Sequence, residues 1–450
     1  MSKYLKPILA LTVLVMLISA CATPTATPAP TEAATTEAPT AATTEAPTAA
    51  PTSAAPAFCG DAKAGDTLHV MYQWTGAEEE KINAIFKPFV DQCGVKIVAE
   101  STRDASVLDT RVKSTPPDIL FWPTTAPLSL YPDKLKDLAS VGASTANYAQ
   151  YWLDLGTKDS KLFAIPVKVD IKSIIWYSPA RFAALGYTVP TTFEELNTLV
   201  EKMVADGNVP WSMGFASDAA TGWTGSDFIQ DLLLTQQGPQ YVLDIISGKV
   251  PYNDPGVVTA YETYKKWASD PKYTVGGATG TLNTPFLDAI YKVFQEKPEA
   301  MMVKQSGFAG GEIVKQFPNL KYGTDYDFFA FPGIKGMQGG ADYMMAFSDS
   351  AAAKALVGYL TGADGAKAWA QTGFDLSPNK LAMGQYTDPQ LIKKSEALDK
   401  ATGFTPDLGD TIPAPFGETE WKAIIQVVQG GDIKTALDSV AAAQKQALGQ

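Results

Sequence analysis

The residues best suited to chemistry lie where successive predicted strands end. Trp74 ends the first predicted strand, Arg103 and Asp104 follow the second, and Trp122 ends the third. In open α/β sheets, ligands bind beyond the carboxyl ends of the strands. Carboxylates accept hydrogen bonds from vicinal hydroxyl groups, and indole faces cover the C–H faces of pyranose rings. These residues therefore favour binding of a polyhydroxylated ligand, with rim packing as the alternative for each tryptophan.

Most catalytic and metal-binding chemistry is excluded by the residue types present. The chain has one histidine, His69, which is expected to be packed within the first strand, so Ser-His-Asp and Cys-His catalysis are excluded. Histidine-based zinc and non-haem iron sites are excluded for the same reason. Neither a phosphate-binding P-loop nor a G-x-G-x-x-G turn after a strand is present, and no cofactor or metal is expected. A carboxylate pair of a glycoside hydrolase stays open.

Strands that alternate with helices position these residues. Hydrophobic spacing predicts strands over 67–74, 95–101 and 118–122, with helices over 75–93 and 106–115 between them. Thr75 and Glu78 form a capping-box pattern at the start of the first helix. The alternation predicts an α/β fold with a mainly parallel, doubly wound sheet. Further helices are expected over 191–207 and around 226–237, 256–268, 284–296, 350–360, 364–372, 388–400 and 417–429.

The stretch "LFAIPVKVDIKSIIWYS", residues 162–178, combines two strand patterns. Lys168, Asp170 and Lys172 alternate with apolar residues and share one face. The apolar run over 174–177 is typical of a strand buried on both faces. The segment is therefore either an edge strand with a wet side or a strand that crosses an open cleft between two lobes.

Length and charge narrow the classes of protein. A chain of 450 residues and 48.0 kDa is long for a single core, so two domains are expected. The formal net charge is −12. A body this acidic repels phosphate backbones, so we expect no nucleic acid partner.

The N-terminus is predicted to be an export signal. Lysines precede a short apolar run over residues 7–20, which suits a signal peptide over 1–20 better than a membrane span. The ending "ISAC" resembles a bacterial lipobox, which would make Cys21 the lipidated anchor to the membrane; a plain secretory signal is the alternative. Residues 21–57 form a Thr-, Ala- and Pro-rich tether expected to be disordered.

The two other cysteines are Cys59 and Cys93. An exported chain meets oxidising conditions, and both residues are expected at one end of the first strand–helix unit. A disulfide is therefore predicted, with two free buried thiols as the alternative.

Six segments in the same order carry a resemblance to a known family. They are "WTGAEEEKINAIFKPFVDQCGVKI", "STRDASVLDTRVKSTPPDILFWP", "FAIPVKVDIKSIIWYSPARFAALGYTVPTTFEEL", "ATGWTGSDFIQDLLL", "GGADYMMAFSD" and "FDLSPNK". The chain resembles the bacterial extracellular solute-binding proteins of carbohydrate ABC transporters, in the maltose-binding-like group and its α-glucoside-binding branch. The resemblance covers residues 66–440. It implies a two-lobed periplasmic-binding-protein fold of type II, with lobe one over 58–168 and 338–376 and lobe two over 169–337 and 377–450.

The resemblance also implies ligand-binding residues on both lobes. Asp170 stands where the family places a sugar-binding acid, here one methylene shorter than the usual Glu. Structural alternatives remain open: a helix cap for Glu78, a salt bridge for Arg103 and Asp104, a helix-dipole contact for Asp227, and a buried helix face for Trp421. The full expected set is Trp74, Glu78, Arg103, Asp104, Trp122, Lys168, Asp170, Trp223, Asp227, Gln305, Asp342 and Trp421.

The function implied by the resemblance is that of a receptor rather than an enzyme. Such a receptor binds a carbohydrate, an α-glucoside or another oligosaccharide, in the cleft between its lobes. It closes on the sugar and delivers it to an ABC transporter permease. A monomer is implied as well. A lipid-anchored glycoside hydrolase and a surface adhesin are the alternatives.

Overall fold

The computed structural model describes residues 56–450. The predicted signal peptide, the predicted lipidation site Cys21 and nearly all of the predicted tether lie outside the described residues. Within residues 56–450, none of the helices is both long enough and apolar enough to cross a membrane.

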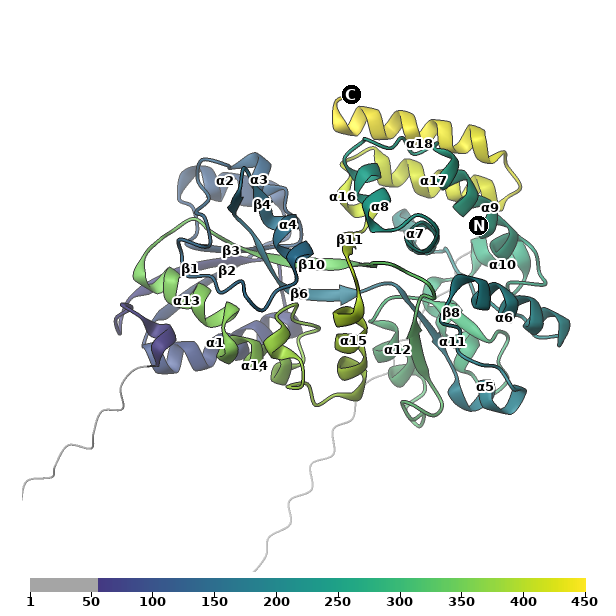
Figure 1. Cartoon of the computed structure of the whole chain (residues 1–450), viewed down its shortest axis with the longest axis horizontal. Coiled ribbons are helices and arrows are strands. Elements are labelled where there is room, and N and C mark those ends of the chain that lie inside the picture. Colours follow the sequence, from purple (N-terminus) through teal and green to yellow (C-terminus); the bar gives the residue numbers. More distant parts are fainter. Residues whose placement is uncertain (1–55) are drawn as a thin grey trace, which may run out of the picture. The chain divides into compact units, whose positions relative to one another are not determined.

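Two main sheets organise the described chain (Figure 1). The larger sheet has six strands in the order β11-β10-β3-β1-β2, and β6 also pairs with β10. A second sheet has the order β8-β7-β9, and β4 and β5 form a small hairpin. The strands are β1 Thr67–Tyr72, β2 Lys96–Ser101, β3 Ile119–Trp122, β4 Thr157–Lys158, β5 Lys161–Leu162, β6 Ile165–Ile171, β7 Ile174–Tyr177, β8 Met302–Lys304, β9 Asp327–Ala330, β10 Met337–Ala346 and β11 Phe404–Pro406.

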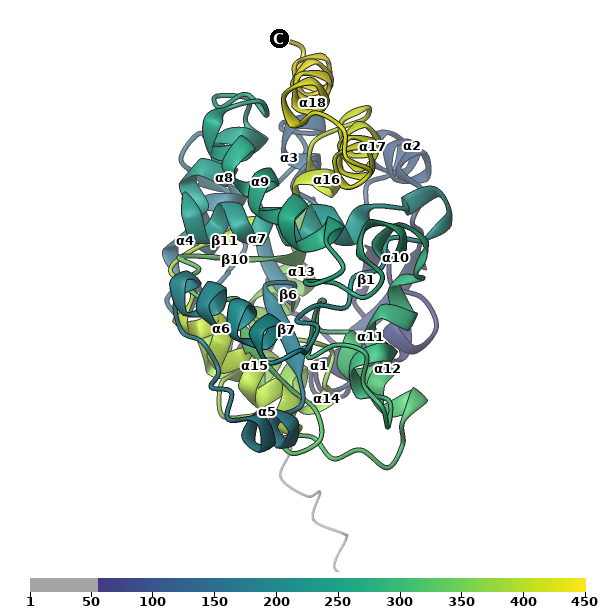
Figure 2. The same ribbon diagram turned by 90° about the vertical axis from the view of Figure 1, so that its right-hand side faces the viewer.

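Helices flank both sheets (Figures 1 and 2). The seven later helices predicted from residue 226 on are present to within a few residues, whereas α3, α4, α5, α8, α10, α12, α16 and α18 were not predicted. The helices are α1 Ala77–Cys93, α2 Ala105–Ser114, α3 Pro127–Leu130, α4 Gln150–Gly156, α5 Pro179–Leu185, α6 Phe193–Ala205, α7 Trp223–Gln236, α8 Pro239–Ile246, α9 Pro255–Ser269, α10 Gly277–Asn283, α11 Phe286–Phe294, α12 Ala309–Gln316, α13 Ala351–Thr361, α14 Ala363–Thr372, α15 Pro389–Lys400, α16 Leu408–Thr411, α17 Phe416–Val428 and α18 Ile433–Leu448.

The first three strands confirm the predicted α/β pattern. β1 pairs in parallel with both β2 and β3, and α1 and α2 provide the connections. β10 then enters the same sheet antiparallel to β3. The sheet is therefore mixed, because the chain returns to it from the second sheet through β10.

The stretch over 162–178 connects the two sheets. β6 pairs with β10 in the larger sheet and ends at Ile171, and β7 begins three residues later in the second sheet. Figure 2 shows β6 and β7 following one another through the middle of the fold. This confirms that the segment crosses from the larger sheet to the second sheet.

Two hydrophobic cores meet at β7. Ile174 and Trp176 belong to the core that also contains β1 and β3, whereas Ile175 and Tyr177 belong to the core of the second sheet. Successive side chains of a strand point to opposite faces, so β7 is buried on both. This explains its unbroken apolar run. The exact lobe boundaries stay a prediction, and β11, from the range expected in lobe two, joins the larger sheet.

Two local expectations were wrong. The capping box at Thr75 and Glu78 does not form, because Gly76 with φ 57° is the N-cap of α1 and no side chain caps it. His69 is exposed rather than packed, since it lies on the outer side of β1 near the start of the strand. A complete capping box is instead formed by Thr192 and Glu195 at the start of α6.

The predicted disulfide between Cys59 and Cys93 is confirmed, with a Cα–Cα distance of 5.4 Å. It joins the residues before β1 to the end of α1. Replacing both cysteines by alanine should lower the free energy of unfolding by about 4 kcal/mol, because the crosslink closes a loop with a sequence separation of 34. Urea unfolding of both proteins under non-reducing conditions measures this. A loss below about 1 kcal/mol would contradict the prediction, and dithiothreitol should leave the double variant unaffected.

Candidate functional site

A polar face runs along the two paired strands that join the sheets. β10 pairs with β6 through Gly340 opposite Asp170 and Asp342 opposite Lys168, and the Lys172 N–H donates to the Gln338 carbonyl at 2.8 Å. Residues paired across antiparallel strands point to the same side. We call this surface the polar ribbon face; it consists of Lys168, Asp170, Lys172, Gln338, Gly340 and Asp342.

One end of the polar ribbon face holds a cluster centred on Lys168. Its ammonium lies 3.2 Å from Asp342 Oδ2, 3.2 Å from Asp375 Oδ2 and 3.8 Å from Glu78 Oε1. Although burial disfavours the charge, these carboxylates raise the pKa of Lys168. Glu78 also pairs with the exposed Arg103 at 3.1 Å. The Lys168 cluster thus offers both hydrogen-bond donors and acceptors.

Trp74 is buried next to the Lys168 cluster. Its side chain is 1% exposed and packs against Phe121, Trp369 and Phe374. The indole N–H donates to Asp342 Oδ2 at 3.0 Å. Trp74 therefore holds Asp342 in place and has no free face for stacking.

The other end of the polar ribbon face holds a cluster centred on Lys172. Its ammonium lies 2.7 Å from Asp407 Oδ2, 3.2 Å from Asp227 Oδ1 and 3.9 Å from Asp410 Oδ2. The Gln338 amide donates to Asp227 at 3.0 Å and to Asp407 at 3.1 Å. Three crossing segments, β6, β10 and β11, therefore deliver residues to one point at the first turns of α7.

Two of the three carboxyl groups of the Lys172 cluster, Asp227 and Asp407, titrate differently. Burial raises the pKa of Asp227 to about 8, even though Lys172 and Lys304 oppose the shift. Burial acts in the same direction on Asp407, but the Lys172 ammonium and several hydrogen bonds hold the pKa of that carboxyl well below its usual range. Asp407 consequently carries the negative charge that neutralises Lys172.

A cavity of about 290 Å³ opens beside the Lys172 cluster. Trp223 and Trp421 are half-buried and provide its aromatic walls, and Lys172 Nζ lies 5.9 Å from the centre of the Trp223 ring. Gly222, with φ 108°, allows the segment before α7 to approach α17, since a Cβ there would lie 3.0 Å from Trp421 Cβ. The lining residues are Lys172, Ala220, Trp223, Ser226, Asp227, Asp407, Asp410 and Trp421.

Asp170 lies between the two clusters. A Cβ on Gly307 would collide with its Oδ1 and would lie 2.7 Å from Lys394 Nζ, so the loop after β8 and helix α15 close one side of the face. Burial, and next the nearby Asp375 carboxylate, raise the pKa of Asp170 to about 6. Its pairing opposite Gly340 of β10 and its closeness to Gly307 place Asp170 at the junction of the segments that join the sheets.

Glu420 is a buried acid that accepts a hydrogen bond from Ser226, one of the residues that line the cavity. It is fully buried next to Trp421 in α17 and accepts hydrogen bonds from Tyr252 and, at 2.8 Å, from Ser226 of α7. Burial raises the pKa of Glu420 from 4.5 to about 7. The protonated acid therefore stabilises the fold fully below pH 4.5, and this contribution is lost as the pH rises through 7.

The stability of Glu420→Gln should depend less on pH than that of the wild type. Between pH 5 and pH 8, the free energy of unfolding should fall by about 2–3 kcal/mol less in the variant, because glutamine carries no charge to desolvate. Urea unfolding at both pH values tests this. Glu418→Gln, on the exposed side of the same helix, is the control, and equal slopes for Glu420→Gln and wild type would contradict the argument.

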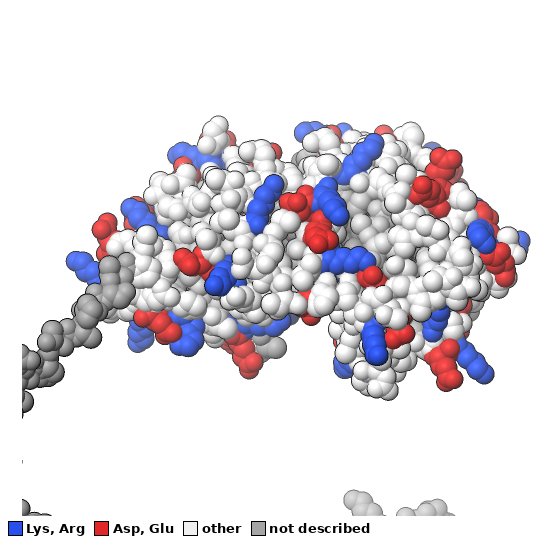
Figure 3. Space-filling model, turned by 60° about the horizontal axis from the view of Figure 1, so that its bottom comes forward, with Lys and Arg blue, Asp and Glu red and all other residues white. Residues whose placement is uncertain are grey.

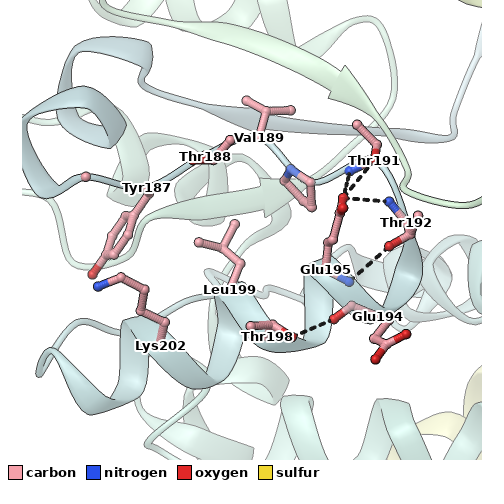
Figure 4. A pocket seen from close by; sticks show the side chains of 12 residues that line it. Tyr187, Thr188, Val189, Thr191, Thr192, Glu194, Glu195, Thr198, Leu199 and Lys202 are labelled. Carbon is pink, nitrogen blue, oxygen red and sulfur yellow. Dashed lines mark hydrogen bonds between the residues drawn. The ribbon is translucent and has the colours of Figure 1, made fainter.

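A larger cavity of about 700 Å³ lies elsewhere, against α6 and the connection that precedes it (Figure 4). Glu195 there accepts hydrogen bonds from Thr191 and Thr192, and Lys202 lies over the Tyr187 ring at 5.2 Å. These polar groups serve the helix cap and the helix surface and do not converge on a ligand position. We therefore place the site at the polar ribbon face despite its smaller cavity.

Figure 3 shows basic and acidic side chains interspersed over one face, without a broad patch of either sign. Among residues 56–450, no group of three or more His, Cys, Asp and Glu side chains is arranged to hold a metal ion.

The structure brings together part of the expected residue set. Glu78, Lys168, Asp170, Asp227, Asp342, Trp223 and Trp421 lie along the polar ribbon face or its cavity. Asp104 instead caps α2 by accepting from the Ser106 N–H at 2.8 Å, and Trp122 and Gln305 are buried. Sequence reasoning missed Lys172 as a site residue, although it continues the alternation of Lys168 and Asp170. It also missed Gln338, Asp375, Asp407, Asp410 and Glu420.

Comparison with known proteins identifies the family of this chain. The family described as bacterial extracellular solute-binding protein matches residues 75–367. The alpha-glucosides-binding periplasmic protein AglE of Rhizobium meliloti is 32% identical over 85% of this chain and 87% of that protein. The osmoprotective compounds-binding protein GgtB of Synechocystis is 29% identical over 84% of this chain and 92% of that protein.

A solved structure shows the same fold. The bacterial solute receptor AcbH, described with an exclusive preference for β-D-galactopyranose, superposes with a TM-score of 0.71 at 21% identity over 85% of this chain and 100% of that one. The expected two-lobed fold of type II is thereby confirmed. The chain belongs to the family of bacterial extracellular solute-binding proteins.

Proposed function

We propose that this protein is the extracytoplasmic receptor that binds a carbohydrate, an α-glucoside or another oligosaccharide, and delivers it to an ABC transporter permease. The observation that carries the proposal is the pairing of charged clusters with an aromatic-walled cavity at the crossing strands. Hydroxyl groups both donate and accept hydrogen bonds, and each cluster presents an ammonium beside carboxylates. The relatives named for α-glucosides and osmoprotective compounds support the same ligand class.

The crossing segments provide the mechanism. Ligand that contacts residues on both sides of β6 and β10 favours the closed arrangement of the lobes, because those contacts are complete only there. A nearly complete shift of the equilibrium requires about 5 kcal/mol of preferential binding to the closed form. The closed protein then docks on the permease. The proposed ligand contacts are those of the expected set that lie along the polar ribbon face, together with Lys172 and Asp407.

A glycoside hydrolase is the rival. Asp227 and Asp407 both contact Lys172 and have pKa values pushed in opposite directions, a pattern that also occurs in acid–base pairs. Both carboxyl groups are buried, however, and Lys172 and Gln338 donate hydrogen bonds to Asp227 Oδ1 and Asp407 Oδ2, which makes both groups fixed partners of the lysine. We therefore assign these residues to ligand binding and propose that the protein is not an enzyme.

The remaining assignments follow from the sequence. We propose that Cys21 carries the lipid that anchors the receptor to the membrane and that residues 22–57 tether the body to it. The acidic body, with a net charge of −12 for the whole chain, fits no nucleic acid partner. A monomer suffices for binding, since one chain supplies both clusters.

Isothermal titration of the purified full-length protein in mild detergent tests the proposal. The panel is maltose, trehalose, sucrose, maltotriose, glucose and xylo-oligosaccharides, and the sugar is recovered afterwards by chromatography. Saturable binding with the sugar returned intact is expected. Cleavage of the bound sugar would establish the hydrolase, and absence of heat with every ligand would overturn carbohydrate binding.

A further inference from the structure

An uncovered glycine lies midway between the two charged clusters. Gly340 is the one exposed residue of β10. A Cβ added to it would meet no heavy atom within 4 Å. Its neighbour Gly339 is different, because a Cβ there would collide with the Asp170 carbonyl and the Phe404 ring. The open space into which a Cβ of Gly340 would project therefore lies on the same side of β10 as the polar ribbon face, whereas the other side of the strand is packed.

The surroundings bound this space on three sides. Asp342, two residues along β10, belongs to the Lys168 cluster, and Gln338, two residues in the other direction, belongs to the Lys172 cluster. Asp170 stands opposite Gly340 on β6, next to the loop that contains Gly307. Charged or polar side chains thus surround a position that has no side chain of its own.

The backbone of Gly340 does not require glycine. Gly340 is absent from the residues with positive φ, whereas Gly222, for example, has φ 108°. Glycine inside a strand lowers stability, since it contributes no packing and loses more conformational entropy on folding. A glycine with open space and ordinary backbone geometry at this place is therefore best explained by a ligand that occupies the volume a side chain would fill.

We propose that Gly340 is the floor of the ligand site and that the ligand lies across it as two linked sugar rings, one end at the Lys168 cluster and the other at the Lys172 cluster. This inference rests on the proposed carbohydrate binding. Gln338 and Asp342 are four residues apart on one strand, which corresponds to about 13 Å. Because both clusters are attached to the same strand, this separation does not depend on how the lobes are oriented.

The distance of about 13 Å between the two ends of the polar ribbon face determines which size of ligand can contact both clusters. A single pyranose ring reaches one cluster and leaves the other to water. Two linked rings place hydroxyl groups at both ends and pass over the glycine between them, where the absence of a side chain lets a ring approach the backbone. Trp223 and Trp421 border the Lys172 end, so one ring can be covered there.

The test is to measure binding and stability together for Gly340→Val and Gly340→Ala. Valine at 340 should weaken binding of the two-ring sugar roughly 10- to 100-fold, because its methyl groups occupy the ligand volume. Alanine should give a smaller loss in the same direction. The melting temperature of the ligand-free protein should be unchanged or raised, since both residues suit a strand better than glycine. A loss of binding without a loss of stability distinguishes steric exclusion from damage to the fold.

Gly358→Ala in α13 is the matched control. A Cβ there makes only an ordinary contact, 3.6 Å from the Gly142 carbonyl oxygen, and α13 packs against α14 and β1 and contains no residue of either cluster. Its sugar affinity should equal that of the wild type. Glucose should bind the wild type at least tenfold more weakly than the preferred two-ring sugar.

Each outcome has one meaning. Unchanged affinity in Gly340→Val would overturn the floor assignment, and glucose binding as tightly as any two-ring sugar would overturn the two-ring assignment. Both results presuppose that the wild type binds sugar, so they leave the receptor function standing. Failure of the wild type to bind any sugar would instead refute the proposed function itself.

Discussion

Lys172→Met is expected to lower the free energy of unfolding by about 3–5 kcal/mol. The substitution removes the ammonium that contacts Asp407 at 2.7 Å and Asp227 at 3.2 Å, and it leaves a buried carboxylate without its counter-charge. Breaking a buried ion pair on one side has a cost of this size. Urea unfolding at pH 7 measures the difference.

Two further variants make the Lys172 prediction specific. Lys266→Met removes a comparable pair with Glu201, but both side chains are about half exposed (52% and 51%), so its effect should stay below about 1 kcal/mol. Asp407→Asn in the Lys172→Met background should recover part of the lost stability, because asparagine can still accept the Asp410 N–H at the start of α16. Equal effects of Lys172→Met and Lys266→Met would refute the buried-charge argument.

Trp223→Ala is expected to weaken carbohydrate binding by about 30- to 150-fold. A sugar ring that covers roughly 100 Å² of the indole gains on the order of 2–3 kcal/mol, which corresponds to that change in affinity. Trp223 is half-buried, borders the cavity beside Lys172, and packs edge-on against Phe286. Isothermal titration with the sugar preferred by the wild type measures the loss.

Trp223→Phe serves as the conservative variant. Phenylalanine retains an apolar ring face, so it should restore about half of the binding free energy lost in Trp223→Ala. The melting temperatures of the two variants should differ less than their affinities, since the tryptophan ring is only partly packed. Affinity that survives in Trp223→Ala would exclude the ring as a sugar platform and would transfer that role to Trp421.

The crossing of the chain between the sheets could be predicted from sequence. The alternation at Lys168 and Asp170 followed by the apolar run at 174–177 left an edge strand and a crossing strand as alternatives, and the family resemblance implied the crossing strand. The disulfide between Cys59 and Cys93 was accessible in the same way, because one strand and one helix place both cysteines at the same end. Helices with clear hydrophobic spacing, such as α9 and α17, were found for the same reason.

Local sequence patterns did not reveal the contacts of several side chains whose partners lie far away in the chain. Trp74 at a strand end resembled a binding platform, but Trp369 and Phe374, almost 300 residues later in the chain, cover it. Glu78 matched a capping box, yet its carboxylate contacts Lys168 and Arg103 instead. In both cases the competing partners come from segments that no local window contains.

The sequence by itself determined the α/β class and the disulfide, since these depend on periodicity and residue type, and its family resemblance implied the crossing strand. The tertiary structure alone decided which residues form the site. Lys172, Asp227, Gln338 and Asp407 are spread over more than 230 residues, and they meet because three crossing segments converge on the start of α7. The same convergence leaves the space above Gly340 open. A burial pattern in the sequence indicates whether a residue lies inside or outside the fold. It does not indicate which distant residue lies opposite, and the energy of a charge pair depends on the distance between the two charges.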